Sequence, residues 1–159
     1  MVCYRRGPRS GGFPGVPDNK TAGWLIVDDD SEGVKFGKGW KRRHNTNGEQ
    51  VGNFSHYPEK DAWKVTYPLP VEKAGRYVLM GKTPYIYNAK PGSKTAFELT
   101  SGGKTEKFFF DQAQGTGSWQ KIGEFDLAPG ATLAIVPKRS NGFVVADGFA
   151  LVPVKEDRQ

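Results

Sequence analysis

The stretch "NGFVVADGFALVPV", residues 141–154, reads as a buried β-strand that contains one charged residue. Alternate residues on one face of this strand are large and apolar: Phe143, Val145, Phe149 and Leu151. Asp147 falls in the middle of that face, where an ionised carboxylate without a partner is costly. The stretch therefore predicts a core strand and, at Asp147, a carboxylate that needs a partner inside the protein.

Short runs of the same kind recur along the 159-residue chain, between turns rich in its 21 glycines and 11 prolines. In "DAWKVTYPLP" (61–70) large residues alternate with smaller polar ones, as in a half-buried strand. Residues 95–112 and 118–139 each predict a β-hairpin, with turns at 101–103 and 128–130. We therefore expect an all-β fold, a single antiparallel β-sandwich of the jelly-roll type. Its expected core comprises Trp63, Val65, Tyr67, Phe125, Leu133, Phe143, Val145 and Phe149, and by the same alternation we place Trp119 in the core.

The sandwich is expected to span residues 22–154, because the flanking segments have a different composition. Residues 1–21 are basic and rich in glycine and proline, which favours a flexible arm or linker. Residues 155–159 form a short polar tail. The first twenty residues lack the apolar run of a secretory signal peptide, so an exported protein would correspond to a fragment or processed form.

The partner of Asp147 is the next question. In a jelly roll the first and last strands often share a sheet, which brings Asp28 near Asp147, and two adjacent carboxylates repel. Asp147 then has three open interpretations. It accepts hydrogen bonds from backbone N–H groups or Trp24, or it pairs with an arginine or lysine. The third is a structural calcium ion shared with a carboxylate near the first strand: Asp28, Asp29 or Asp30. We favour the first, so we treat Asp28 and Asp147 as structural and predict no cofactor, with calcium as the alternative.

Charge and composition exclude some classes of function. Lys and Arg number 23 against 17 Asp and Glu, a net charge of +6, which favours an anionic partner. No apolar run is long enough to span a membrane. Cys3 is the single cysteine, so an internal disulfide and a cysteine-rich zinc site are both excluded.

Four segments in order resemble the carbohydrate-binding-like module found at the C-terminus of golvesins and beside xanthan-lyase-type enzymes. The segments are "WLIVDDD", "AWKVTYPLPVEKAGRYVLM", "FFFDQAQGTGSWQKIGEFDLAPG" and "NGFVVADGFALV". The matching positions are Ile26, Val27, Asp28, Trp63, Pro70, Ala74, Gly75, Tyr77, Gln112, Gly117, Trp119, Gly123, Phe125, Gly142, Val144, Val145, Ala146 and Asp147.

The resemblance implies a carbohydrate-binding-module-like sandwich, an extracellular or cell-surface location, and an appended or partner enzyme. Structural positions are then Asp28, Asp147, Trp63, Trp119 and Gln112. The chain departs from the family in "ADGFAL", where the pattern usually continues "ADAVRF", and in the basic "GWKRRH".

Catalytic motifs are lacking. The sequence has no G-x-S-x-G and no phosphate-binding loop spacing, and Cys3 lies in the arm. The carboxylates that qualify for a glycosidase pair are Glu98, Glu106, Asp111, Glu124 and Asp126. In "GEFDL", however, the two acids alternate with Phe125 and suit a solvated surface. We therefore predict that the chain is not an enzyme.

The sequence supports a binding function better than a catalytic one. Aromatic rings stack under the C–H faces of sugars, and guanidinium groups make paired contacts with carboxylates or sulfates. The candidate ligand-binding residues, all near turns, are Trp40, Arg42, Arg43, Tyr57, Tyr85, Tyr87 and Asn88. Lys38 and Lys41 add to the charge around Trp40. We predict a non-catalytic module for a polysaccharide, acidic in character, that targets an exported enzyme.

Two other classes of function fit parts of the sequence. Residues 1–20 are suited to docking on neighbouring subunits, which defines a structural or assembly protein. Basic, aromatic β-folds also bind single-stranded nucleic acid, although the 17 acidic residues dilute the positive charge here.

Overall fold

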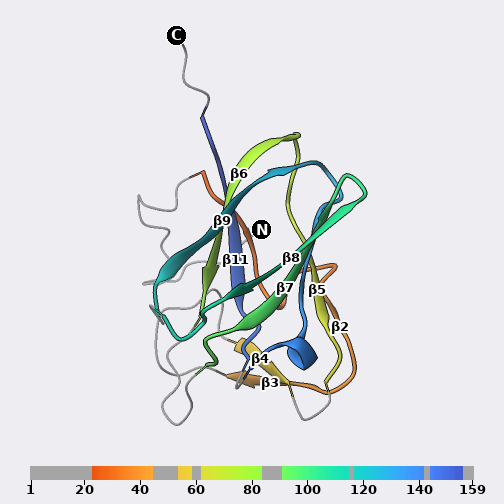
Figure 1. Ribbon diagram of the computed structural model, residues 1–159, viewed down its shortest axis with the longest axis vertical. Coiled ribbons are helices and arrows are strands. Elements are labelled where there is room, and N and C mark those ends of the chain that lie inside the picture. Colours follow the sequence, from red (N-terminus) through yellow and green to blue (C-terminus); the bar gives the residue numbers. More distant parts are fainter. Residues whose placement is uncertain are drawn as a thin grey trace.

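The computed structural model (Figure 1) describes residues 23–44, 54–58, 62–83, 91–114, 117–141 and 144–155, with the backbone alone for 42–44 and 54–57. The strands in this part of the chain are β1 (Leu25–Val27), β2 (Lys35–Phe36), β3 (Trp40–His44), β4 (Phe54–Pro58), β5 (Val65–Pro68), β6 (Gly75–Lys82), β7 (Thr95–Ser101), β8 (Lys104–Phe110), β9 (Trp119–Leu127), β10 (Thr132–Ile135) and β11 (Gly148–Pro153). A short 3-10 helix, η2 (Pro137–Arg139), precedes β11. The expected arm and the last four residues lie outside the described ranges.

Two antiparallel sheets face each other in Figure 1. One has the order β1-β11-β6-β9 and the other the order β2-β5-β10-β7-β8. Strands β3 and β4 form a separate two-stranded ribbon at one end of the sandwich. The predicted all-β sandwich is confirmed. Among the described residues no helix is long and apolar enough to cross a membrane.

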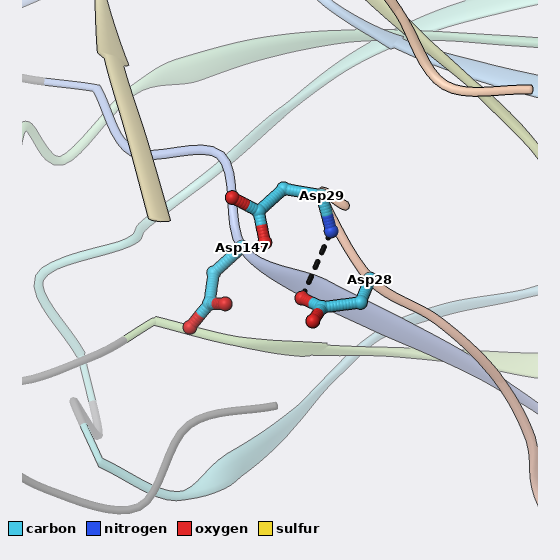
Figure 2. Close-up of side chains that lie close together, drawn as sticks. All are labelled: Asp28, Asp29 and Asp147. Atoms are coloured by element: carbon cyan, nitrogen blue, oxygen red, sulfur yellow. Dashed lines mark hydrogen bonds between the residues drawn. The ribbon is translucent and has the colours of Figure 1, made fainter. Parts of the chain in front are cut away.

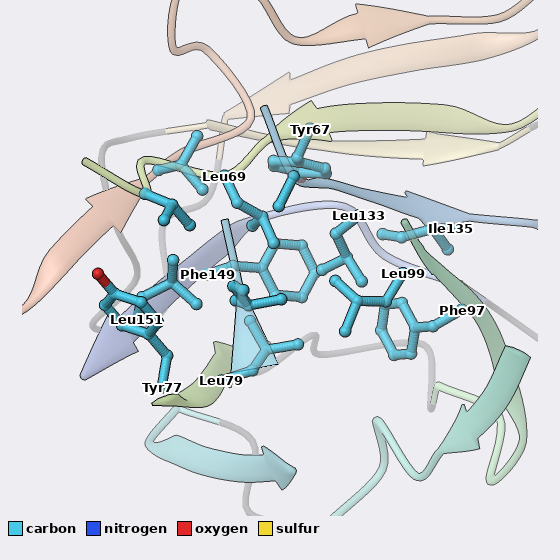
Figure 3. Packing of buried hydrophobic residues seen from close by; sticks show 14 of the residues in the cluster. Tyr67, Leu69, Tyr77, Leu79, Phe97, Leu99, Leu133, Ile135, Phe149 and Leu151 are labelled. Atoms are coloured by element: carbon cyan, nitrogen blue, oxygen red, sulfur yellow. The ribbon is translucent and has the colours of Figure 1, made fainter. Parts of the chain in front are cut away.

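The core lies between the two sheets (Figure 3), and side chains of β5 and β10 are among its most deeply buried. The residues Val65, Tyr67, Leu133 and Ile135 are fully buried. Phe149 from the opposite sheet meets the ring of Tyr67 edge to face, with ring centroids 4.8 Å apart. Burial of each such large side chain contributes about 1.5–3 kcal/mol, so contacts of this kind between the sheets stabilise the sandwich.

Most of the predicted core is confirmed, but two tryptophans are not part of it. The buried members are Val65, Tyr67, Leu133, Val145 and Phe149. Phe125 is partly buried against the core, and Phe143 lies outside the described residues.

Trp63 was predicted to be in the core, and this is wrong because its side chain is 62% exposed. The alternation does not extend to it, since β5 begins at Val65 and the buried position just before the strand is Ala62. Trp119 is half-buried, and its ring packs edge to face on Trp24 with Lys82 5.6 Å from its centre.

One of the two predicted hairpins is correct. Strands β7 and β8 pair along their whole length around Gly102 and Gly103, whose φ angles of +59° and +80° suit a tight turn. The hairpin predicted between β9 and β10 is wrong, because β9 pairs with β6 whereas β10 lies between β5 and β7. The turn at residues 128–130 therefore carries the chain from one sheet to the other, which hydrophobic alternation alone does not distinguish from a hairpin.

Candidate functional site

The pairing of the first and last strands brings three carboxylates together. Val27 of β1 is opposite Phe149 of β11, so the residues that follow β1 lie beside those that precede β11. Asp28, Asp29 and Asp147 meet at this point, and one carboxylate oxygen from each lies within 4.8 Å of the others. The expected proximity of Asp28 and Asp147 is confirmed. We call these three residues the carboxylate triad.

A turn immediately after β1 positions the first two carboxylates. The Ser31 N–H donates to the Asp28 carbonyl (3.0 Å), and the Asp28 N–H donates to Ser31 Oγ (2.8 Å). The Asp29 N–H in turn donates to Asp28 Oδ1 at 2.8 Å. Aspartate and serine favour such turns because their short side chains bond to nearby backbone. Figure 2 shows the side chains of Asp28 and Asp29 directed from this turn toward the region of Asp147.

Buried hydrogen bonds hold the backbone that carries Asp147. The Tyr67 hydroxyl donates to the Asp147 carbonyl at 2.7 Å. The amide of Gln112 clamps Val145: its Nε2 donates to the Val145 carbonyl (2.8 Å) and its Oε1 accepts the Val145 N–H (3.0 Å). Thr95 Oγ1 donates to the same Oε1 at 3.2 Å. The segment 145–147 is therefore held by hydrogen bonds from Tyr67 on one side and Gln112 on the other.

The side chain of Asp147 is the exception in this well-bonded region. The residue is 2% exposed, and neither carboxylate oxygen accepts a hydrogen bond from any described residue. We predicted backbone N–H groups or Trp24 as its donors, and this is wrong: Trp24 packs against Trp119 instead, and the Tyr67 hydroxyl bonds to the backbone of Asp147 rather than to its side chain. The carboxylate is buried at high cost and needs another source of stabilisation.

The electrostatics of the triad reflect this crowding. Burial, followed by the negative charges of Asp28 and Asp29, raises the pKa of Asp147 well above its usual value. Lys82 acts in the opposite direction but does not outweigh them. Burial also raises the pKa of Asp28, reinforced by its neighbour Asp29. As the structure stands, the triad favours a proton or a cation over three bare negative charges.

A second feature is a corner where residues 37–40 wrap around residues 62–64, which we call the tryptophan corner. The Trp63 N–H donates to the Lys38 carbonyl (2.8 Å), and the Gly37 N–H donates to the Lys64 carbonyl (2.9 Å). A Cβ on Gly37 would lie 2.5 Å from the Cβ of Trp63, so the close approach of the two segments requires glycine there.

The two tryptophans of this corner differ in their environment. Trp40 is half-buried, packs against the core and meets Phe36 edge to face at 5.5 Å. Its indole Nε1–H donates to the Trp63 carbonyl at 2.6 Å. Trp63 presents its own ring to solvent. Trp40 therefore anchors the corner, and Trp63 offers the exposed aromatic surface.

The predicted ligand-binding residues are divided among several places. Arg42 and Arg43 lie on β3, and Tyr57 lies on β4 opposite Lys41, so the ribbon joins them to the tryptophan corner through Trp40. Tyr85, Tyr87 and Asn88 lie outside the described residues. Lys38, Lys41 and Lys64 are exposed in or next to the corner, the last 3.8 Å from Glu98.

Three of the carboxylates considered for hydrolysis, Glu98, Glu124 and Asp126, contact basic side chains and do not form a buried pair with one another. Glu124 and Asp126 lie on β9, and each has an oxygen 3.2 Å from a guanidinium nitrogen of Arg76. The side chain of Asp126 is 81% exposed, which confirms the prediction that the acids of "GEFDL" lie on a solvated surface. Glu98, on the other sheet, contacts Lys64 and Arg139.

Comparison with known proteins now identifies the family. The model of the golvesin C-terminal domain matches residues 25–153. The chain belongs to this family. No curated protein matches the sequence significantly.

Solved structures share the fold of this golvesin domain. A xanthan lyase from Paenibacillus matches with a TM-score of 0.71 and 25% identity over 83% of this chain. The GH26-CBM35 β-(1,4)-mannanase of Podospora anserina matches at 0.60 and 19% identity over 86%. A family 35 carbohydrate binding module from Clostridium thermocellum matches at 0.52 and 14% identity over 80%. The chain spans 13%, 29% and 97% of these three proteins, respectively.

One functional candidate, the exposed ring of Trp63, was missed in the sequence. Trp63 was assigned to the core because it continues the alternation of β5. The available signal that another segment lies against it was the pair of glycines in "GKGW" (37–40), where a Cβ would meet Trp63 or Ala62. The lack of a hydrogen-bond partner for Asp147 has no sequence signal, because it depends on which donors the fold brings within reach.

Proposed function

We propose that this golvesin domain is a non-catalytic glycan-binding module for an acidic polysaccharide and that it keeps an exported enzyme near its substrate. Family membership supports an accessory module, as does the likeness to part of a xanthan lyase. The likeness to a family 35 carbohydrate binding module agrees with a binding role, although at 14% identity it bears on the fold alone.

The exposed ring of Trp63 is the observation that carries this proposal. Among the described residues it is the most exposed of the large apolar side chains, at 62%. Such a ring loses little by leaving water and can cover the apolar C–H face of a sugar. Its backbone is bonded to Lys38, and Trp40 and Gly37 fix the surrounding segments, so the platform is held in place before a ligand arrives.

Charge around the corner supports an acidic ligand. Lys38, Lys41 and Lys64 are exposed there, and β3 continues into Arg42 and Arg43. Lysine and arginine attract uronate carboxylates and sulfate esters, and arginine binds them in a paired geometry. The basic residues of β3 therefore follow Trp40 of the tryptophan corner directly along the chain.

An accessory role requires only modest affinity. A module tethered to an enzyme acts at a high effective concentration, so a dissociation constant of about 1 mM to 1 μM suffices. The proposed substrate-targeting role therefore does not depend on a deep pocket.

Affinity electrophoresis through gels that contain neutral, uronate-rich or sulfated polysaccharides tests the proposal. We expect retardation by at least one acidic polymer. We also expect the double variant Arg42→Ala, Arg43→Ala to bind more weakly than the wild type, with a larger loss of affinity at low salt than at high salt because salt screens exposed charges. Failure to bind any glycan would overturn the proposal. In that case, salt-dependent binding of single-stranded oligonucleotides would favour a nucleic-acid function, and an oligomer that needs residues 1–20 would favour an assembly function.

A further inference from the structure

We propose that Asp28, Asp29 and Asp147 bind one calcium ion that fastens the end of β1 to the beginning of β11. The inference is independent of glycan binding, since it rests on the carboxylate triad and not on the tryptophan corner. It starts from Asp147, which is 2% exposed and whose two oxygens accept no hydrogen bond from the described residues.

Charge balance favours a divalent cation. Three carboxylates whose oxygens lie within 4.8 Å of one another carry three negative charges when ionised, and like charges this close repel strongly away from water. Lys82 is the basic group that acts on Asp147, and its ammonium group lies 5.6 Å from the centre of the Trp119 ring. A divalent ion at the triad, together with this lysine, brings the local charge to neutrality.

The donor set suits calcium. All three side chains offer carboxylate oxygens, and calcium is bound by six to eight oxygens in a flexible geometry in which carboxylates act with one or both oxygens. Both oxygens of Asp147 are available for this purpose. Magnesium demands stricter octahedral geometry and retains several waters, which a buried triad accommodates less well.

The position of the triad gives such an ion a structural effect. Strand β1 is three residues long and lies at the edge of its sheet, where β11 is its neighbour. Asp28 and Asp29 directly follow β1, and Asp147 directly precedes β11. An ion bound by both segments would hold the end of β1 against the beginning of β11. Because such an ion binds only the folded state, calcium would stabilise that state by mass action.

Thermal unfolding after treatment with EDTA tests the proposal. We expect calcium to raise the Tm of the wild type by several degrees, magnesium to have a smaller effect, and Asp147→Asn to abolish the response. In EDTA we expect Asp147→Asn to be at least as stable as the wild type, because the substitution removes a repelling charge and preserves the shape. Glu106→Gln, an exposed change on β8 of the other sheet, should respond to calcium like the wild type.

Terbium luminescence excited through the aromatic side chains provides a second readout. Terbium is a calcium substitute, and the buried Tyr67, whose hydroxyl contacts the Asp147 backbone, is placed to sensitise it. We expect emission with the wild type and with Glu106→Gln that calcium displaces, and none with Asp147→Asn. The inference is overturned if calcium leaves the Tm of the wild type unchanged, which would indicate a shared proton, or if Asp147→Asn retains the calcium response.

Discussion

The carboxylate triad and the tryptophan corner depart from ordinary burial in opposite directions. Asp147 is a charged side chain that is 2% exposed without a hydrogen bond from the described residues. Trp63 is a large apolar side chain that is 62% exposed, although Ala62 just before it is buried. Within the described residues, Asp147 lacks hydrogen-bond donors for its carboxylate, and Trp63 lacks neighbours that cover its ring. Sites of this kind are where local rules fail for functional reasons.

Gln112 shows that burial of a polar group is not in itself unusual in this protein. Like Asp147 it is deeply buried, at 3% exposed, but its amide makes the hydrogen bonds to Val145 and Thr95 described above. The difference separates a buried polar side chain whose hydrogen bonds are satisfied from one whose oxygens have no donor among the described residues. The predictions below test this distinction.

The largest expected effect is the loss of Gln112. Gln112→Ala leaves the Val145 N–H and carbonyl without partners in the core, and each orphaned group costs about 1–3 kcal/mol. We expect the free energy of unfolding, measured with urea, to fall by about 2–5 kcal/mol both with calcium and with EDTA. Gln114→Ala, an exposed change two residues away, is the control and should have little effect. A loss at Gln112 that appears only in EDTA would contradict a purely structural assignment.

The next largest effect is a difference in stability between alanine variants of the two tryptophans of the corner. Trp40→Ala removes a ring that packs on the core and bonds to the Trp63 carbonyl, and we expect a loss of about 2–4 kcal/mol, somewhat below that of a fully buried tryptophan. Trp63→Ala removes an exposed ring and should cost less than about 1 kcal/mol. Urea unfolding of both variants measures the difference. Equal losses would mean that Trp63 is covered in solution and that the corner has been misassigned.

A smaller effect is expected from pH in the presence of EDTA. The pKa values of Asp147 and Asp28 are raised in the folded state by burial, so the folded protein holds these protons more tightly than the unfolded chain. Their contribution to stability is fully present below the unfolded pKa of about 3.9 and is lost as pH rises through the folded pKa. The wild type should therefore lose stability relative to Asp147→Asn as pH rises, and the two should converge in acid. Thermal unfolding of both proteins across this range gives the difference, and a difference independent of pH would count against a crowded, uncompensated triad.

Much of the fold was predictable because it depends on local patterns. Alternation in residues 61–70 placed Val65 and Tyr67 in the core correctly, and the turn at 101–103 predicted the β7–β8 hairpin. The pairing of β9 with β6 was not predictable in this way, since sheet membership depends on contacts between segments distant in sequence.

The candidate site was only partly predictable for the same reason. The proximity of Asp28 and Asp147 followed from the expected jelly roll, and the register confirms it. The absence of a donor for Asp147 and the exposure of Trp63 depend on the placement of Tyr67 and of residues 37–40, which bond to backbone rather than cover these side chains. Such details arise only when the segments are assembled.

The central claim is that Trp63 is the platform on which a polysaccharide stacks. Isothermal titration calorimetry in calcium, with the acidic polymer that retards the wild type most, measures it directly. The matched control is Phe109→Ala, which removes another exposed aromatic ring, 52% exposed on β8. We expect Trp63→Ala to weaken binding by at least about tenfold, or ~1.4 kcal/mol, with an unchanged Tm, while Phe109→Ala binds like the wild type. Wild-type affinity in the Trp63→Ala variant would contradict the account.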